Sequence, residues 1–243
     1  MTTACAVQAR WKMIYLARRN PALAAQDFAQ AWREHSALGR QCHNVQDKVL
    51  GVTQCTRLRE DGENGGLYGA STGYDGVNLL QLRDLDVATD IWSDPETLAI
   101  MRPDEPRVFS TYVRDFTLVC RERVLRAAPA GEVALFGFVR RSSGILKSEF
   151  DAAWAGDPPD AWAWLAAPAL QGALRVVHNS VVQTPPAGYD YDGIAEWWFA
   201  SADAVRMAFA TGDLRARLPA AYGALADLEH SVFMFTQVSH RRP

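Results

Sequence analysis

The sequence predicts an α+β fold made of two copies of one βαββαβ unit, because two of its patterns recur in the same order. The segments 12–32 and 133–154 both carry a double Arg and then a Phe and a Trp four residues apart. The strings YDGV at 74–77 and YDGI at 191–194 form the second pair. In both cases the copies lie about 120 residues apart. Two units of about 110 residues are each large enough to hold a core of their own.

Each copy alternates between strand and helix patterns in one fixed order. Apolar runs rich in β-branched and aromatic residues predict first strands at 12–19 and 133–140. Leu, Phe, Ala and Trp at helical spacing predict a first helix after each of these strands. The other predicted elements are second strands at 50–58 and 174–183, third strands at 74–82 and 191–199, second helices from Asp84 and from Ser201, and last strands at 116–124 and 232–239. This order is ferredoxin-like, with an antiparallel four-stranded sheet covered by helices on one face.

The other face of each predicted sheet also needs a cover. The string IAEWWF at 194–199 places large side chains on both faces, because neighbouring residues of a strand point in opposite directions. Glu196 shares its face with Ile194 and Trp198. We therefore expect units 8–126 and 131–243 to bring their sheets face to face as an intramolecular, pseudo-dimeric α+β barrel. The space between the sheets is the expected functional cavity.

Composition excludes several classes of partner. The chain is 49% hydrophobic and 22% charged with a formal net charge of −3, which gives no electrostatic bias toward nucleic acid or a membrane surface. Its start lacks a signal-peptide pattern, and no run approaches the ~20 apolar residues of a spanning helix, so a cytoplasmic location is expected.

Metal and nucleophile motifs are also missing from the sequence. The four cysteines form no CxxC pair, which predicts reduced thiols; they are Cys5, Cys42, Cys55 and Cys120. No HxxxE or HxH spacing predicts a metal site. The Gly-rich stretch 62–73 has neither a GxGxxG pattern nor a following Lys, so it predicts a flexible loop that could cover the cavity mouth rather than a phosphate loop. No metal or cofactor is expected.

Several of these strings resemble the EthD domain family of the dimeric α+β barrel superfamily. They are YDGIAEWWFAS at 191–201, the strand that ends in a double Arg, the Phe and Trp four residues apart, and HSAL at 35–38. The string RVVHNSVV at 175–182 is similar to the second strand of the family, which commonly carries an Asn at the place of Asn179. The resemblance spans most of the chain as two copies. It implies a role in bacterial small-molecule catabolism, with oxidoreductase or lyase chemistry that uses neither metal nor organic cofactor.

The first helix departs from the pattern of that family in one respect. The family places a His four residues after the Trp, whereas His35 follows Trp32 by three and Ser36 takes the fourth place. A helix turns by ~100° per residue, so this shift changes the direction of the imidazole. The corresponding stretch of the second half has no His. One site per chain is therefore expected.

Three residues are the candidate catalytic groups. His35 lies near the end of the first helix, and the alternative is a solvated or capping His. His178 lies in the middle of a strand and could transfer protons if its face lines the cavity, whereas the alternative is a hydrogen-bonded core His. Glu196 would have a raised pKa if it were buried without a partner. The alternative is an ion pair with a cation such as Arg175.

The candidate substrate-binding residues are aromatic or amide side chains on the same elements: Trp32, Asn179, Trp198, Tyr15 and Tyr112. For the tryptophans, core packing is the alternative. The predicted function is a cofactor-independent enzyme, of oxidoreductase or lyase/isomerase type, acting on a small apolar or aromatic compound. The alternatives are a non-catalytic ligand-binding or accessory protein of a degradation pathway and a barrel filled by its own tryptophans. The expected partner is a small molecule, bound by a monomeric pseudo-dimer or a further homodimer, without nucleic acid or membrane.

Overall fold

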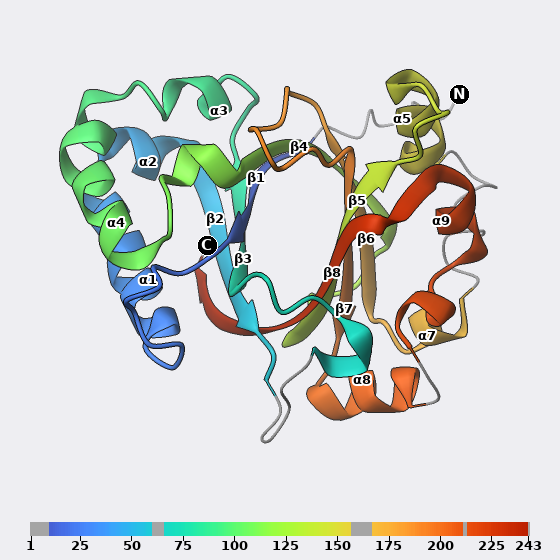
Figure 1. Ribbon diagram of the computed structural model, residues 1–243. Helices are drawn as coiled ribbons and strands as arrows, with labels where there is room; N and C mark the ends of the chain where they lie inside the picture. The colour runs from blue at the N-terminus through green and yellow to red at the C-terminus, as the bar shows by residue number, and fades with distance from the viewer. Residues whose placement is uncertain (1–9, 60–65, 157–166, 211–212, 243) are drawn as a thin grey trace, which may run out of the picture.

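The computed structural model describes residues 10–59, 66–156, 167–210 and 213–242. Within these residues, eight strands form one closed antiparallel barrel in the order β1-β3-β2-β8-β5-β7-β6-β4 (Figure 1). The strands are β1 Arg10–Ala17, β2 Val49–Arg57, β3 Gly76–Leu82, β4 Thr117–Arg126, β5 Val133–Arg141, β6 Arg175–Val181, β7 Gly193–Phe199 and β8 Ala226–Arg242. The predicted α+β class and the barrel within one chain are confirmed.

The two halves of the chain contribute four neighbouring strands each. The first half supplies β4-β1-β3-β2 and the second half supplies β8-β5-β7-β6. The halves join where β2 pairs with β8 and where β4 pairs with β6. The expected barrel of two facing sheets is therefore closed by pairing of the sheet edges, which leaves no free strand edge in the barrel.

All eight predicted strands are confirmed within a few residues, except that β8 is longer than the predicted 232–239. Its length allows it to pair with β5 and then with β2 across the junction of the halves. The helices are α1 Phe28–Leu38, α2 His43–Lys48, α3 Val87–Asp90, α4 Glu105–Val108, α5 Lys147–Ala155, α7 Pro168–Gln171, α8 Ala202–Phe209 and α9 Ala220–Leu225. Ser201 caps α8 as predicted, and its hydroxyl accepts the N–H of Ala204.

The single helix predicted from Asp84 is instead a series of short turns. Between α3 and α4 lie a π-turn at Thr97–Met101 and a 3₁₀ turn at Arg102–Asp104. Prolines interrupt this stretch, and a proline inside a helix removes one hydrogen bond and clashes with the preceding turn. The segment from α3 to α4 covers the sheet and leaves a cavity beneath it. A single straight helix would leave a space of another shape.

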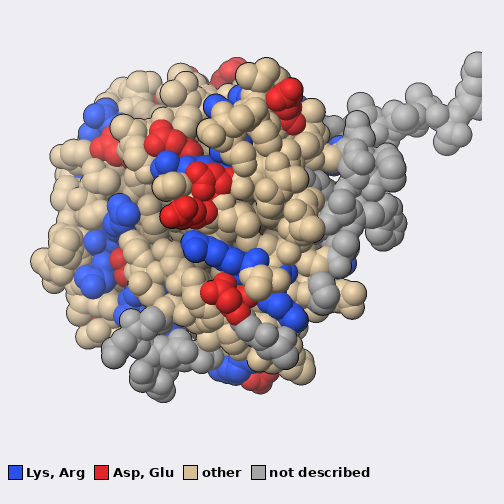
Figure 2. Space-filling model, turned by 45° about the vertical axis from the view of Figure 1, so that its right-hand side comes forward, with Lys and Arg blue, Asp and Glu red and all other residues tan. Residues whose placement is uncertain are grey.

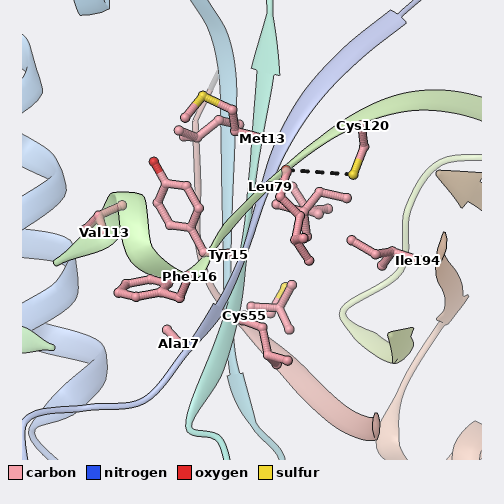
Figure 3. Packing of buried hydrophobic residues seen from close by; sticks show 14 of the residues in the cluster. Met13, Tyr15, Ala17, Cys55, Leu79, Val113, Phe116, Cys120 and Ile194 are labelled. Atoms are coloured by element: carbon pink, nitrogen blue, oxygen red, sulfur yellow. Dashed lines mark hydrogen bonds between the residues drawn. The ribbon is translucent and has the colours of Figure 1, made fainter. Parts of the chain in front are cut away.

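The helices lie outside the barrel, with α1–α4 on one side and α5, α7, α8 and α9 on the other (Figure 1). Side chains of the strands alternate between the helix-covered outer face of the sheet and the interior of the barrel. Tyr15 points to the helix side, whereas Leu79 and Ile194 from other strands lie on the barrel side (Figure 3). Inside the barrel, Ile14 and Phe136 are fully buried. The expected functional cavity between the sheets is thus a packed core across its middle, because side chains fill the interior of an eight-stranded barrel.

Acidic and basic side chains are interspersed on the face shown in Figure 2, without a continuous patch of one sign. No helix in the described ranges has the length and apolar character needed to cross a membrane. The described thiols Cys42, Cys55 and Cys120 are buried and free, and Cys5 lies outside the described residues. The Gly-rich stretch is described only from Gly66, so the predicted loop falls partly outside.

Candidate functional site

A cavity lies between the outer face of the first-half sheet and the helices α1–α4, and we call it the first-half cavity. It holds about 50 Å³ of space for the centres of water-sized molecules, which is room for a few waters or a small flat group. Trp32 and His35 reach it from the buried face of α1, one helical turn apart. Tyr15, Asn78 and Glu105 reach it from β1, β3 and α4, and most of its remaining wall is apolar.

His35 is the best-positioned base in this cavity. The imidazole is 4% exposed, and its Nδ1 lies 3.0 Å from Oδ2 of Asp104. Burial lowers the pKa of His35 despite the opposing effect of Asp104, so the ring is neutral at pH 7. With its proton on Nδ1, donated to Asp104, the ring keeps a lone pair on Nε2. No described residue hydrogen-bonds to Nε2.

Asp104 is itself held in place by a cation. Nε of Arg107 lies 2.7 Å from Oδ1 of Asp104, and Nη2 lies 3.1 Å from Oδ2. The hydrogen bond from Arg107 lowers the pKa of Asp104, so this carboxylate stays charged and fixes the tautomer of His35. Phe109 supports the imidazole from the side, with ring centroids 5.4 Å apart. The base is therefore oriented by a second group, as enzymatic bases commonly are.

A carboxyl group and an amide complete the polar part of the cavity. Glu105 is 5% exposed, and its Oε2 accepts the N–H of Val113 at 2.8 Å. Burial raises the pKa of Glu105, and its Oε1 has no hydrogen-bond partner in the described part of the chain. Oδ1 of Asn78 is buried and also lacks a partner. A neutral base, a carboxyl group of raised pKa and a free acceptor together can carry acid–base chemistry on a bound molecule.

Sequence reasoning missed Asp104, Glu105, Asn78 and Arg107. The only local signal for the first two was a pair of acids between prolines in the string RPDEPRV at 102–108. That signal does not reveal that Asp104 meets a histidine 69 residues earlier in the chain.

A second polar cluster lies inside one end of the barrel. Nζ of Lys12 lies 2.6 Å from Oε2 of Glu122 and 2.5 Å from Oε1 of Glu196. Asn179 Nδ2 donates to Oε1 of Glu196 at 2.8 Å, and Trp198 Nε1 donates to Oε2 at 2.9 Å. Burial opposes the charge on Lys12, but the two carboxylates raise its pKa. The cluster therefore ties β1, β4, β6 and β7 together as a buried ion-pair network.

Glu196 does form an ion pair, which was the alternative to a catalytic role, but its cation is Lys12 and not Arg175. Arg175 approaches Glu122 instead, at 3.6 Å, and Glu196 is neutralised by Lys12 from the first strand. An open recess of about 600 Å³ lies outside this end of the barrel, and Glu196 and Trp198 form part of its wall.

His178 lies on the outer face of β6, so it does not meet the condition for proton transfer in a cavity between the sheets. Its ring stacks on Trp154 at a centroid distance of 3.9 Å. Nδ1 lies 3.0 Å from the carbonyl oxygen of Trp154, and Nε2 lies 3.2 Å from the hydroxyl of Tyr222. Burial lowers the pKa of His178 to about 3. These contacts are those of a hydrogen-bonded core histidine.

Acid sensitivity follows from this burial. Because the folded-state pKa of His178 lies below the ordinary 6.5, its neutral form supports the fold above pH 6.5, and this support is lost as the pH falls toward 3. We expect the free energy of unfolding of the wild type to fall about 1.4 kcal/mol per pH unit more steeply below pH 6.5 than that of His178→Gln. Urea unfolding at a series of pH values checks this, and parallel pH profiles would contradict it.

The predicted site residues thus fall into two groups and two single positions. Tyr15, Trp32 and His35 share the first-half cavity. Glu196, Asn179 and Trp198 share the barrel end. His178 lies in the second-half core, and Tyr112 is 40% exposed beneath the guanidinium of Arg102, outside the first-half cavity.

Solved structures of similar fold cover almost the whole chain. An anthrone oxidase-like protein superposes with a TM-score of 0.61 at 12% identity, covering 96% of this chain and 92% of that one. A candidate monooxygenase from Fusobacterium nucleatum subsp. nucleatum gives 0.55 at 8% identity, with coverage of 96% and 94%. A candidate monooxygenase from Lactobacillus acidophilus gives 0.51 at 9%, with coverage of 96% and 95%. At these identities the likeness shows the fold alone.

The model of the EthD domain family matches residues 20–111, which is less than half of the chain. The resemblance to this family is thereby confirmed over that range. The matched range includes β2, β3 and the helices α1–α4, which form most of the wall of the first-half cavity. No curated protein matches the chain.

Proposed function

We propose that this protein is an enzyme of small-molecule catabolism that performs acid–base chemistry on a small apolar or aromatic compound in the first-half cavity. The observation that carries the proposal is the pair of His35 and Asp104 beside a largely apolar cavity, in which Nε2 of His35 has no hydrogen-bond partner among the described residues. The EthD domain and the oxidase-like and monooxygenase-like names of the structural neighbours support the same class of chemistry.

The chemistry begins with the removal of a proton from the substrate by Nε2 of His35. The electron pair of the broken bond stays on the substrate, and the resulting imidazolium is stabilised by Asp104. Return of a proton from His35 or from Glu105 to another atom of the substrate completes an isomerisation. In the lyase form the electron pair instead expels a leaving group, which takes up that proton. In the oxidase form the electron pair forms a bond to dioxygen, and the proton from His35 completes a substrate hydroperoxide. Trp32 and the apolar wall hold the substrate and exclude water.

We also propose that residues 8–126 and 131–243 are two ferredoxin-like repeats that arose by duplication. Matching contacts in the two halves support this. The backbone N–H of Arg19 donates to Asp75 at 3.1 Å, and that of Arg141 donates to Asp192 at 3.0 Å. In each half the guanidinium of the preceding arginine lies over a tyrosine ring, Arg18 over Tyr74 and Arg140 over Tyr191.

The tryptophans of the two first helices also make matching contacts. The carbonyl oxygen of Trp32 accepts from Gln54 at 3.4 Å, as that of Trp154 contacts His178. In the second half, His178 and Tyr222 pack against Trp154. Their side chains fill the space beside the first helix that is a cavity in the first half. This difference supports a single site per chain, with a small molecule as the partner of a monomeric pseudo-dimer.

The test is a turnover screen with small aromatic, phenolic and ether compounds, without added cofactor and with a chelator present. We expect consumption of at least one compound. Activity under nitrogen would assign the isomerase or lyase form, and dependence on dioxygen would assign the oxidase form. Tight binding of compounds without any turnover would contradict the proposal and would favour the non-catalytic ligand-binding alternative.

A further inference from the structure

Basic side chains surround the outer edge of the first-half cavity. Arg33, from the middle of α1, and Arg40, from the turn after it, meet His240 and Arg242 from the end of β8. Together they line a hollow of about 140 Å³, which we call the basic recess. Ser36 and Arg242 line both the basic recess and the first-half cavity. The two hollows are therefore neighbours that share part of their walls.

The charges of the basic recess have no acidic partner among the described residues. The one side-chain hydrogen bond of Arg33 is to the neutral amide of Gln30, and no ion pair involves Arg40, His240 or Arg242. This differs from arginines such as Arg107, which contacts two carboxylates. Partial burial lowers the pKa of His240, and the nearby positive charges of the recess lower it further.

The end of α1 explains only part of this arrangement. A cation in the last turn of a helix is favoured by the partial negative charge there, which accounts for Arg40. This charge does not explain the positions of His240 and Arg242, which come from the last strand and are separated from α1 by about 200 residues of chain. Three guanidinium groups, those of Arg33, Arg40 and Arg242, converge there without a carboxylate and repel one another, and an anion removes that repulsion.

We propose that the basic recess binds the carboxylate of a small organic acid whose apolar body occupies the first-half cavity. The inference rests on the proposed function for the location of the reacting part of the substrate, and it defines the substrate class as a compact aromatic or aliphatic acid. Arg40 and Arg242 supply planar guanidinium groups, which suit a carboxylate because they can donate two parallel hydrogen bonds. In this arrangement Arg242 is a positioning residue that connects the anchor to the cavity.

The test is calorimetric titration of the full chain with sodium benzoate and with benzamide, which has the same shape without the charge. We expect benzoate to bind and benzamide to bind at least about tenfold more weakly. The double variant Arg40→Gln/Arg242→Gln should weaken benzoate binding by about tenfold or more. Arg33→Gln, at an exposed helical position, provides the same test if the double variant does not fold.

Arg215→Gln is the matched control, because it removes one positive charge from an exposed position outside the recess. It should bind benzoate like the wild type. Equal binding of benzoate and benzamide, or unchanged binding by the double variant, would overturn the inference. Inorganic phosphate that binds as tightly as benzoate would also overturn it, by showing a site for free anions.

These outcomes are distinct from a failure of the proposed function. Charge-dependent benzoate binding without turnover of any compound, acid or neutral, would leave the basic recess established and would refute the enzyme. Turnover of neutral compounds only, with no charge-dependent binding, would do the reverse.

Discussion

Replacement of His35 by Ala is expected to lower kcat by about 10²–10⁴-fold on any compound that the wild type consumes, because a positioned base contributes about that much. Asp104→Asn should cause a smaller loss, since the base remains but its tautomer is no longer fixed. The measurement is steady-state turnover of the purified variants. His230→Ala is the matched control, because His230 is exposed and paired with Asp227 away from the cavity, and it should keep full activity.

The pH dependence of the wild type gives an independent check of this role. Burial lowers the pKa of His35 below the ordinary 6.5, so the base is free at neutral pH and is lost only as the pH falls through that lowered value. The acid limb of kcat/KM should therefore lie below pH 6.5. An acid limb above pH 7, or full activity in His35→Ala, would show that another group is the base.

Replacement of Lys12 by Ala is expected to lower the free energy of unfolding by about 3–5 kcal/mol, because it leaves Glu196 buried without its cation. Glu122 keeps only the more distant guanidinium groups of Arg10 and Arg175, each at 3.6 Å. Chemical unfolding in urea measures the loss. Neutralising the whole cluster, as Lys12→Met/Glu122→Gln/Glu196→Gln, should recover most of it, since the cost comes from unpaired charge rather than from lost packing.

Lys48→Ala is the control for the loss of a lysine at a more exposed ion pair. Its ammonium lies 3.1 Å from Asp90, whose side chain is largely exposed, so the expected loss is below about 1 kcal/mol. A loss of that small size in Lys12→Ala as well would show that water from the recess at the barrel end stabilises the two carboxylates.

Much of the fold could be predicted from the sequence because strands and amphipathic helices leave local patterns. Alternation alone placed Glu196 and Trp198 on the same face of β7, and the structure has them joined by a hydrogen bond on the barrel face. The breaks after Asp84 were harder, since several short turns still satisfy a loose helical spacing. The closure of the barrel by edge pairing of β8 depends on geometry over the whole chain.

The candidate site was predictable only in part. His35, Trp32 and Tyr15 were identified, but their common location on the helix side of the sheet was not. The partner of Glu196 lies 184 residues away in the chain, and no local pattern reports such a contact. For His178, the sequence offered two roles that differ only in which face of β6 looks outward.

The central claim is that small molecules react in the first-half cavity and not between the sheets. Crystals of the protein soaked with small aromatic acids and their neutral analogues test it most directly. We predict electron density for the bound compound beside His35, Trp32 and Tyr15, with any carboxylate toward Arg242. Density confined to the barrel end beside Glu196 and Trp198 would contradict the account.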